Sequence, residues 1–119
     1  MQDYKELIVW QKAHSLTLKI YKATEVFPKS ELFNLVSQLR RAGASIPCNI
    51  AEGCGRRTNA DFANFLQISL GSANETEYLL LLSKDLKYLT QDLFEELNQE
   101  VNEVKAMLIS FIKKVRQTT

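Results

Sequence analysis

The chain has 119 residues, of which 45% are hydrophobic and 24% charged, a composition typical of a globular protein rather than a disordered one. Fifteen basic and fourteen acidic residues leave a net charge of +1, so the total charge requires no polyanionic partner. No apolar run approaches the roughly 20 residues of a membrane-spanning helix, and the N-terminus lacks the features of a secretory signal. We therefore expect one domain over residues 1–119, in the cytoplasm, with no membrane partner.

Apolar residues recur every three or four positions in four successive segments, which is the pattern of amphipathic helices. The first segment covers residues 9–27 and is ended by Pro28. The second covers residues 32–50, and Ser30 is available as its N-cap. Glycines follow this second segment and are expected to end it.

The third segment covers residues 59 to about 89 and begins at Thr58, which resembles a capping box with Asp61. Thr90 is the expected cap of the fourth segment. The apolar seam of that segment is Leu97, Val101, Val104, Leu108, Phe111 and Val115. Four helices joined by short turns favour antiparallel neighbours, so we predict an all-α, antiparallel up-down-up-down four-helix bundle.

The third segment is more apolar than a single bundle requires. Tyr78 and the four leucines at 79–82 cover every direction around a helix axis for more than one turn. Part of this apolar girdle is expected to face another subunit. We therefore predict a homo-oligomer.

The central stretch RRAGASIPCNIAEGCGRR, residues 40–57, has the least helix-like composition in the chain. Pro47 lacks a backbone N–H, and its ring opposes the carbonyl of Gly43, four residues earlier. Small residues surround Gly43, so we predict a kink at Pro47 that lets a neighbouring helix approach closely. This stretch is interpreted as a packing device.

Glu75 interrupts an expected inward stripe of the third helix. The stripe consists of Phe65, Ile68, Ser72, Glu75, Leu79, Leu82 and Leu86. A buried carboxylate needs a partner, and the candidates are Arg40, on the flank of the second helix, and the amide of Asn49. The alternative is that Glu75 lies at the solvent edge.

The chain offers few groups for catalysis or metal binding. His14 is the one histidine, and the spacing of Cys48 and Cys54 matches neither CxxC nor half of a zinc motif. The serines have no nucleophile motif, and the glycines near residue 55 do not form a phosphate loop. We expect free thiols, no metal, no cofactor and no enzyme activity.

Basic residues concentrate in the first 58 positions, which carry nine basic and five acidic residues. Arg41, Arg56 and Arg57 are candidate contacts for the phosphates of RNA or DNA, because guanidinium groups bind phosphate bidentately. The first helix can add three lysines, Lys12, Lys19 and Lys22. The alternative is a solvated face on which Glu52 and Arg56 form an ordinary ion pair one turn apart.

A set of short motifs is spread along nearly the whole chain: Trp10-Gln11, Phe27-Pro28, Leu39-Arg40-Arg41-Ala42, Ser45-Ile46-Pro47, Asn49-Ile50-Ala51-Glu52-Gly53, Arg56, Phe65-Leu66, Gly71-Ser72, Glu75 and Glu77. This set resembles the four-helix-bundle proteins encoded in intervening sequences of large-subunit ribosomal RNA genes. The resemblance implies a homopentameric ring without catalytic activity. It extends more distantly to accessory proteins that work beside reverse transcriptases in diversity-generating retroelements.

Two functions are consistent with these observations. The first is a homopentameric nucleic-acid-binding or RNA-associated accessory protein, with RNA or DNA and a reverse transcriptase as candidate partners. The alternative is a scaffold that holds a protein partner without contacting nucleic acid. In both, seven residues are expected to be structural: Arg40, Gly43, Pro47, Asn49, Glu52, Gly53 and Glu75.

Overall fold

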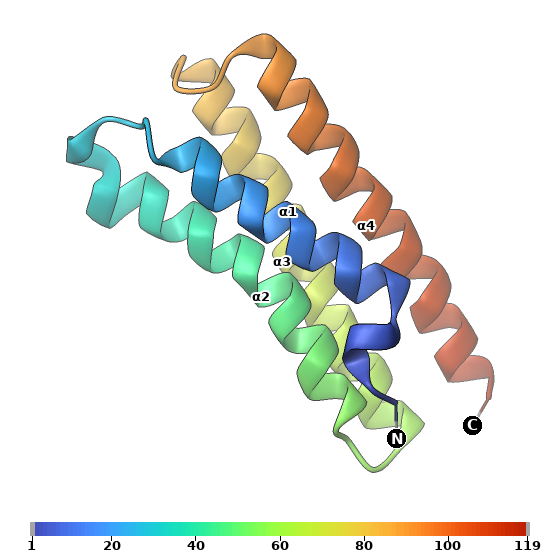
Figure 1. Ribbon diagram of the computed structural model, residues 1–119. Helices are drawn as coiled ribbons and strands as arrows, with labels where there is room; N and C mark the ends of the chain where they lie inside the picture. Colours follow the sequence, from blue (N-terminus) through green and yellow to red (C-terminus); the bar gives the residue numbers. More distant parts are fainter. Residues whose placement is uncertain (1, 119) are drawn as a thin grey trace.

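The computed structural model describes residues 2–118 and contains four long helices, with no strand in that range. The helices are α1 Ile8–Thr24, α2 Ser37–Cys54, α3 Asn59–Asp85 and α4 Gln91–Gln117. They form an elongated body of 47 × 23 × 20 Å (Figure 1). The predicted all-α class with four helices is confirmed.

Each helix packs against two others, in the cyclic order α1, α2, α3, α4. The edge formed by α1 and α2 therefore lies opposite the edge formed by α3 and α4. In Figure 1 the α1–α2 and α3–α4 connections lie at one end of the body, and the α2–α3 connection lies at the other. Features near the first two connections are consequently at a similar level along the body.

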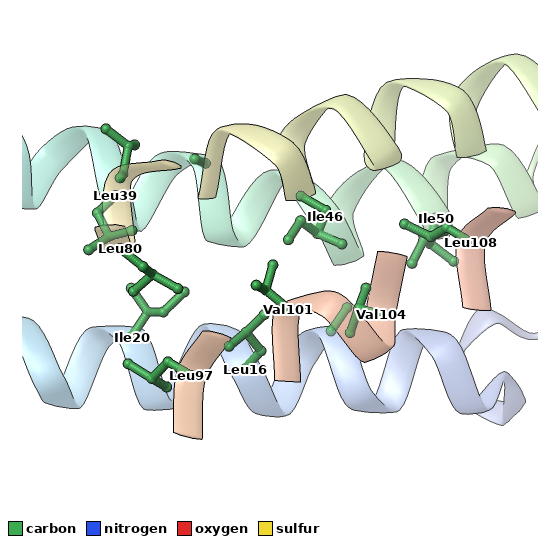
Figure 2. Close-up of a cluster of buried hydrophobic side chains, with 14 of the residues drawn as sticks. Leu16, Ile20, Leu39, Ile46, Ile50, Leu80, Leu97, Val101, Val104 and Leu108 are labelled. Atoms are coloured by element: carbon green, nitrogen blue, oxygen red, sulfur yellow. The ribbon is translucent and has the colours of Figure 1, made fainter. Parts of the chain in front are cut away.

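The core consists of aliphatic side chains that the four helices direct toward one another (Figure 2). Its most deeply buried members are Leu16 and Ile20 of α1, Leu39, Ile46 and Ile50 of α2, Leu66 and Leu80 of α3, and Leu97, Val101, Val104 and Leu108 of α4. The apolar stripe predicted for α1 is confirmed. In α4 the predicted seam holds except at Phe111, which is half-buried while Ile112 is buried.

Hydroxyl side chains cap α3 and α4 as predicted. The backbone N–H of Asp61 donates to Thr58 Oγ1 at 3.1 Å, and that of Leu93 donates to Thr90 Oγ1 at 3.2 Å. The predicted end of α3 near residue 89 is wrong, because the helix stops at Asp85. Lys87 then adopts a φ of 68°, and the N–H of the next residue returns to the carbonyl of Ser83, which closes the helix end.

The start of α2 also differs from the prediction. Ser30 lies inside a short 3₁₀ turn, Lys29–Glu31, and caps no long helix. A π-helical turn, Leu32–Val36, follows and leads into α2. Phe33 has φ and ψ of −96° and 15° within this turn, and its side chain is 92% exposed.

The inward face of α3 is not the predicted one. Its buried residues are Ala63, Leu66, Ser69, Ala73, Thr76, Leu79, Leu80 and Ser83, whereas Ile68 and Leu86 of the expected stripe are exposed. Three of these residues can be buried because their hydroxyls donate to backbone carbonyls: Ser69 to Ile46 at 2.8 Å, Thr76 to Ser72 at 2.8 Å and Ser83 to Leu79 at 2.7 Å. Satisfied small polar residues thus replace the large apolar ones that the pattern favoured.

Candidate nucleic-acid interface

The middle of α2 touches α1 at Gly43. A Cβ at this position would lie 3.0 Å from Ile20 Cδ1, so any larger residue would require the Ile20 side chain to shift. Pro47 removes the helical donor that the Gly43 carbonyl would otherwise use, and Thr17 Oγ1 donates to this carbonyl instead, at 3.0 Å. Glycine and proline therefore act together in packing α1 on α2, while the kink at Pro47 stays a prediction.

The second half of α2 touches α3 in a similar way. A Cβ at Gly53 would lie 2.9 Å from Phe62 Cδ1 and 3.0 Å from Phe65 Cβ. About two turns earlier, the Ile46 carbonyl accepts a hydrogen bond from the Ser69 hydroxyl. These contacts hold α2 between its neighbours and leave its remaining side facing outward.

Arg40 is half-buried at the α1–α2 boundary. Its Nε donates to Thr24 Oγ1 at 2.8 Å, and its terminal nitrogen donates to the carbonyl of Tyr21 at 3.2 Å. The guanidinium also lies over the Tyr21 ring, 4.7 Å from the ring centroid. Arg40 therefore joins two helices through neutral groups, and the predicted pairing with Glu75 is wrong.

Glu75 is exposed and forms no ion pair or hydrogen bond within residues 2–118. The amide of Asn49, the other predicted partner, donates to the Ser45 carbonyl at 2.8 Å and to the Ser45 hydroxyl at 2.9 Å. That hydroxyl in turn lies 2.8 Å from Ser72 Oγ on α3. The prediction of a buried, paired Glu75 is wrong for the single chain, because the face of α3 that carries it points outward.

The three candidate arginines are exposed but do not form one cluster. Arg41 donates to Ser37 Oγ at 3.2 Å, and Arg57 makes no ion pair within residues 2–118. Arg56 lies over the Phe65 ring at 4.5 Å and 3.7 Å from Glu52, which is the ordinary ion pair of the alternative interpretation. Arg41 and Arg56 are fifteen residues apart, or about 20 Å along a helix.

Two of the three lysines predicted to extend this basic surface form ion pairs within the bundle, whereas Lys22 is exposed and has no ion pair in residues 2–118. Lys12 pairs with Glu103, and Lys19 Nζ lies 2.6 Å from Glu100 and 3.3 Å from Glu96. The hydrogen bond to Glu100 raises the pKa of Lys19. Lys12 and Lys19 face the acidic first half of α4, so their charges are largely neutralised within the bundle.

A groove between α1 and α2 was not predicted from the sequence. It has a volume of about 740 Å³, and its lining includes Tyr21, Phe33, Arg40 and Arg41. Phe33 precedes α2 and lies in the turn Leu32–Val36, where its own φ and ψ depart from helical values. The pattern of residues gave no signal for that turn.

The remaining reactive side chains have unremarkable surroundings. His14 stacks on Trp10 with ring centroids 4.9 Å apart, and Cys48 is exposed in the groove. Burial raises the pKa of the Cys54 thiol, and the charge of Asp3 adds to this effect. No group of three potential metal ligands occurs within residues 2–118.

Residues 5–110 match the model of the 23S rRNA-intervening sequence protein family. The chain belongs to this family. A crystal structure from Bacteroides thetaiotaomicron, of a protein with unknown function from the S23 ribosomal protein family, is similar to it at 34% identity with a TM-score of 0.82. The similarity covers 89% of this chain and 96% of the other, and no curated protein matches significantly. Within the described residues of this intervening-sequence protein, no helix is long and apolar enough to cross a bilayer.

Proposed function

We propose that this protein is a non-enzymatic, homopentameric ring of up-down-up-down bundles that binds RNA or DNA through the phosphate backbone. The observation that carries the nucleic-acid contact is the exposure of Arg41 and Arg57 without a carboxylate partner in residues 2–118. Arg56 extends the surface, since its pairing with Glu52 is long and solvent-exposed. Five copies of a weak contact give useful avidity.

Exposed apolar side chains support the assembly. Phe33, Tyr78 and Leu81 are 92%, 59% and 40% exposed in the single chain. Large aromatic residues are enriched in protein interfaces, and an isolated bundle gains nothing from leaving them in water. The motifs shared with intervening-sequence proteins add support for a ring.

An electrophoretic shift assay at two salt concentrations tests the nucleic-acid contact, with structured RNA and duplex DNA as probes. The variant Arg41→Gln/Arg56→Gln/Arg57→Gln should weaken binding and flatten the salt dependence by roughly 0.7–0.9 in log K per log salt for each lost phosphate contact. A matched control is Lys87→Gln/Lys113→Gln/Lys114→Gln, which removes the same charge from other exposed positions. If both variants behave alike, net charge alone drives binding and the three arginines are not the contact.

The second candidate function is a scaffold that holds a protein partner, such as a reverse transcriptase, without contacting nucleic acid. It is favoured by the ion pairs that neutralise Lys12 and Lys19. No shift with either probe at low salt, together with an intact oligomer, would select this function over the first.

A further inference from the structure

Phe33 is the most exposed large hydrophobic residue of the described chain, and its position is specified by an uncommon backbone. It lies in the π-helical turn Leu32–Val36 at the α1–α2 edge of the bundle. The backbone is kinked at Phe33 itself, whose φ and ψ of −96° and 15° are not helical. Here the turn displays an aromatic side chain beside Leu32 and Tyr21, which are 45% and 44% exposed.

The opposite edge carries a complementary hollow. A pocket of about 380 Å³ lies between α3 and α4, lined by Tyr78, Leu81 and Phe94 together with polar side chains. Its volume is sufficient for a phenyl ring. Phe33 lies in the α1–α2 connection, and the pocket is formed by the second half of α3 and the first turns of α4, which flank the α3–α4 connection. Figure 1 shows these two connections at the same end of the body.

The charges of these two edges of the bundle are also complementary. Among the described residues, the lining of the α1–α2 groove includes no carboxylate, and Arg40 has only neutral partners. Residues 91–104 of α4 carry five carboxylates, of which Glu96, Glu100 and Glu103 pair with lysines of α1, while Asp92 and Glu95 form no ion pair in the described chain. Glu95, next to Phe94, is exposed and forms no ion pair in the described chain. Arg40 on one edge therefore has no acidic partner, and Glu95 on the other edge has no basic partner.

We infer that Phe33 of one copy inserts into the Tyr78–Leu81–Phe94 pocket of a second copy, with Arg40 directed toward the acidic half of the second copy's α4. The contact joins two different surfaces, so it is heterologous and every copy uses both. The surfaces lie on opposite edges at a similar level, and successive copies are therefore displaced little along the bundle axis. Combined with a rotation between copies that divides a full turn, this small displacement closes the successive contacts into a ring. The inference rests on the proposed oligomer and specifies its interface.

Two variants each disrupt one of the two surfaces, and a mixture of the variants tests whether these surfaces contact each other. Phe33→Asp removes the inserted ring, and Tyr78→Asp places a charge in the pocket; both side chains are exposed in the single chain, so circular dichroism should show intact folding. Each variant alone should dissociate to the 13.6 kDa monomer in native mass spectrometry, with a dissociation constant raised at least about 30-fold. Ile8→Asp is the control, because Ile8 is 58% exposed at the other end of α1.

Mixing the two variants is decisive. A chain with an intact Phe33 and a chain with an intact pocket can form one contact only, so the mixture should give a 1:1 dimer and no ring. If the wild type is oligomeric but either variant remains so, or if the two monomers do not combine, this pairing is wrong while the oligomer stands. A monomeric wild type at micromolar concentration would overturn the proposed ring itself.

Discussion

Replacing Thr17 with valine should destabilise the bundle by removing the donor to the Gly43 carbonyl. Pro47 offers this carbonyl no N–H, and the Thr17 hydroxyl 3.0 Å away is its tertiary partner. The hydroxyl also lies 2.9 Å from the Ala13 carbonyl, but that group keeps its helical N–H donor. Thr17→Val therefore leaves the Gly43 carbonyl without a hydrogen-bond donor. An unsatisfied buried carbonyl lowers the free energy of unfolding by about 1–3 kcal/mol.

A double-mutant cycle with Pro47→Ala isolates this contact. Alanine restores an N–H that can donate to Gly43 within α2, so Thr17→Val should cost less than about 0.5 kcal/mol in that background. Thr76→Val is the matched control, because Thr76 is buried and donates to a carbonyl of its own helix. Urea unfolding at one fixed protein concentration measures all the variants. Equal costs of Thr17→Val in the two backgrounds would refute the compensation of Pro47 by Thr17.

Three further outcomes are expected. Glu75→Ala should change the free energy of unfolding of the monomeric Phe33→Asp variant by less than about 0.5 kcal/mol, since Glu75 is exposed and unpaired; a larger loss in urea unfolding would place it in a contact. The hydrogen bond from Lys105 lowers the pKa of Glu77 below its usual 4.5. The free energy of unfolding of wild type should therefore exceed that of Glu77→Gln above this pH, and the difference should disappear in acid; a difference that grows in acid would contradict the pairing. In a Cys48→Ser variant, Cys54 should react with maleimide only in denaturant, because burial raises its pKa; rapid labelling of the folded chain would contradict this.

Local signals predicted most of the fold. The caps at Thr58 and Thr90 depend on residues three positions away, and the stripes of α1 and α4 depend on a single helical period. Both kinds of information are present in a short window of sequence. For this reason the number of helices and two of their inward faces could be predicted before any tertiary contact was known.

Tertiary contacts explain what could not be predicted. The inward face of α3 contains Ser69, whose burial depends on a carbonyl of α2 that the local sequence does not reveal. Lys19 loses its availability to a ligand because α4 lies beside α1 and supplies two carboxylates. The helical pattern predicts an inward Glu75 because apolar residues surround it, but two of those residues, Ile68 and Leu86, are exposed on the surface.

The central stretch of α2 connects the packing of the bundle with both proposed interactions. The Gly43 carbonyl, which Pro47 leaves without a helical donor, accepts a hydrogen bond from Thr17 of α1, and Gly53 leaves space for Phe62 and Phe65 of α3. The positions of α2 that remain face outward or lie at the boundary, and they include Arg40 and Arg41, while Arg56 and Arg57 follow in the connection to α3. A substitution at Gly43 should therefore disturb assembly and nucleic-acid binding together, whereas one at Phe33 or Arg57 should separate them. That difference makes the two surfaces independently testable although one helix carries residues of both.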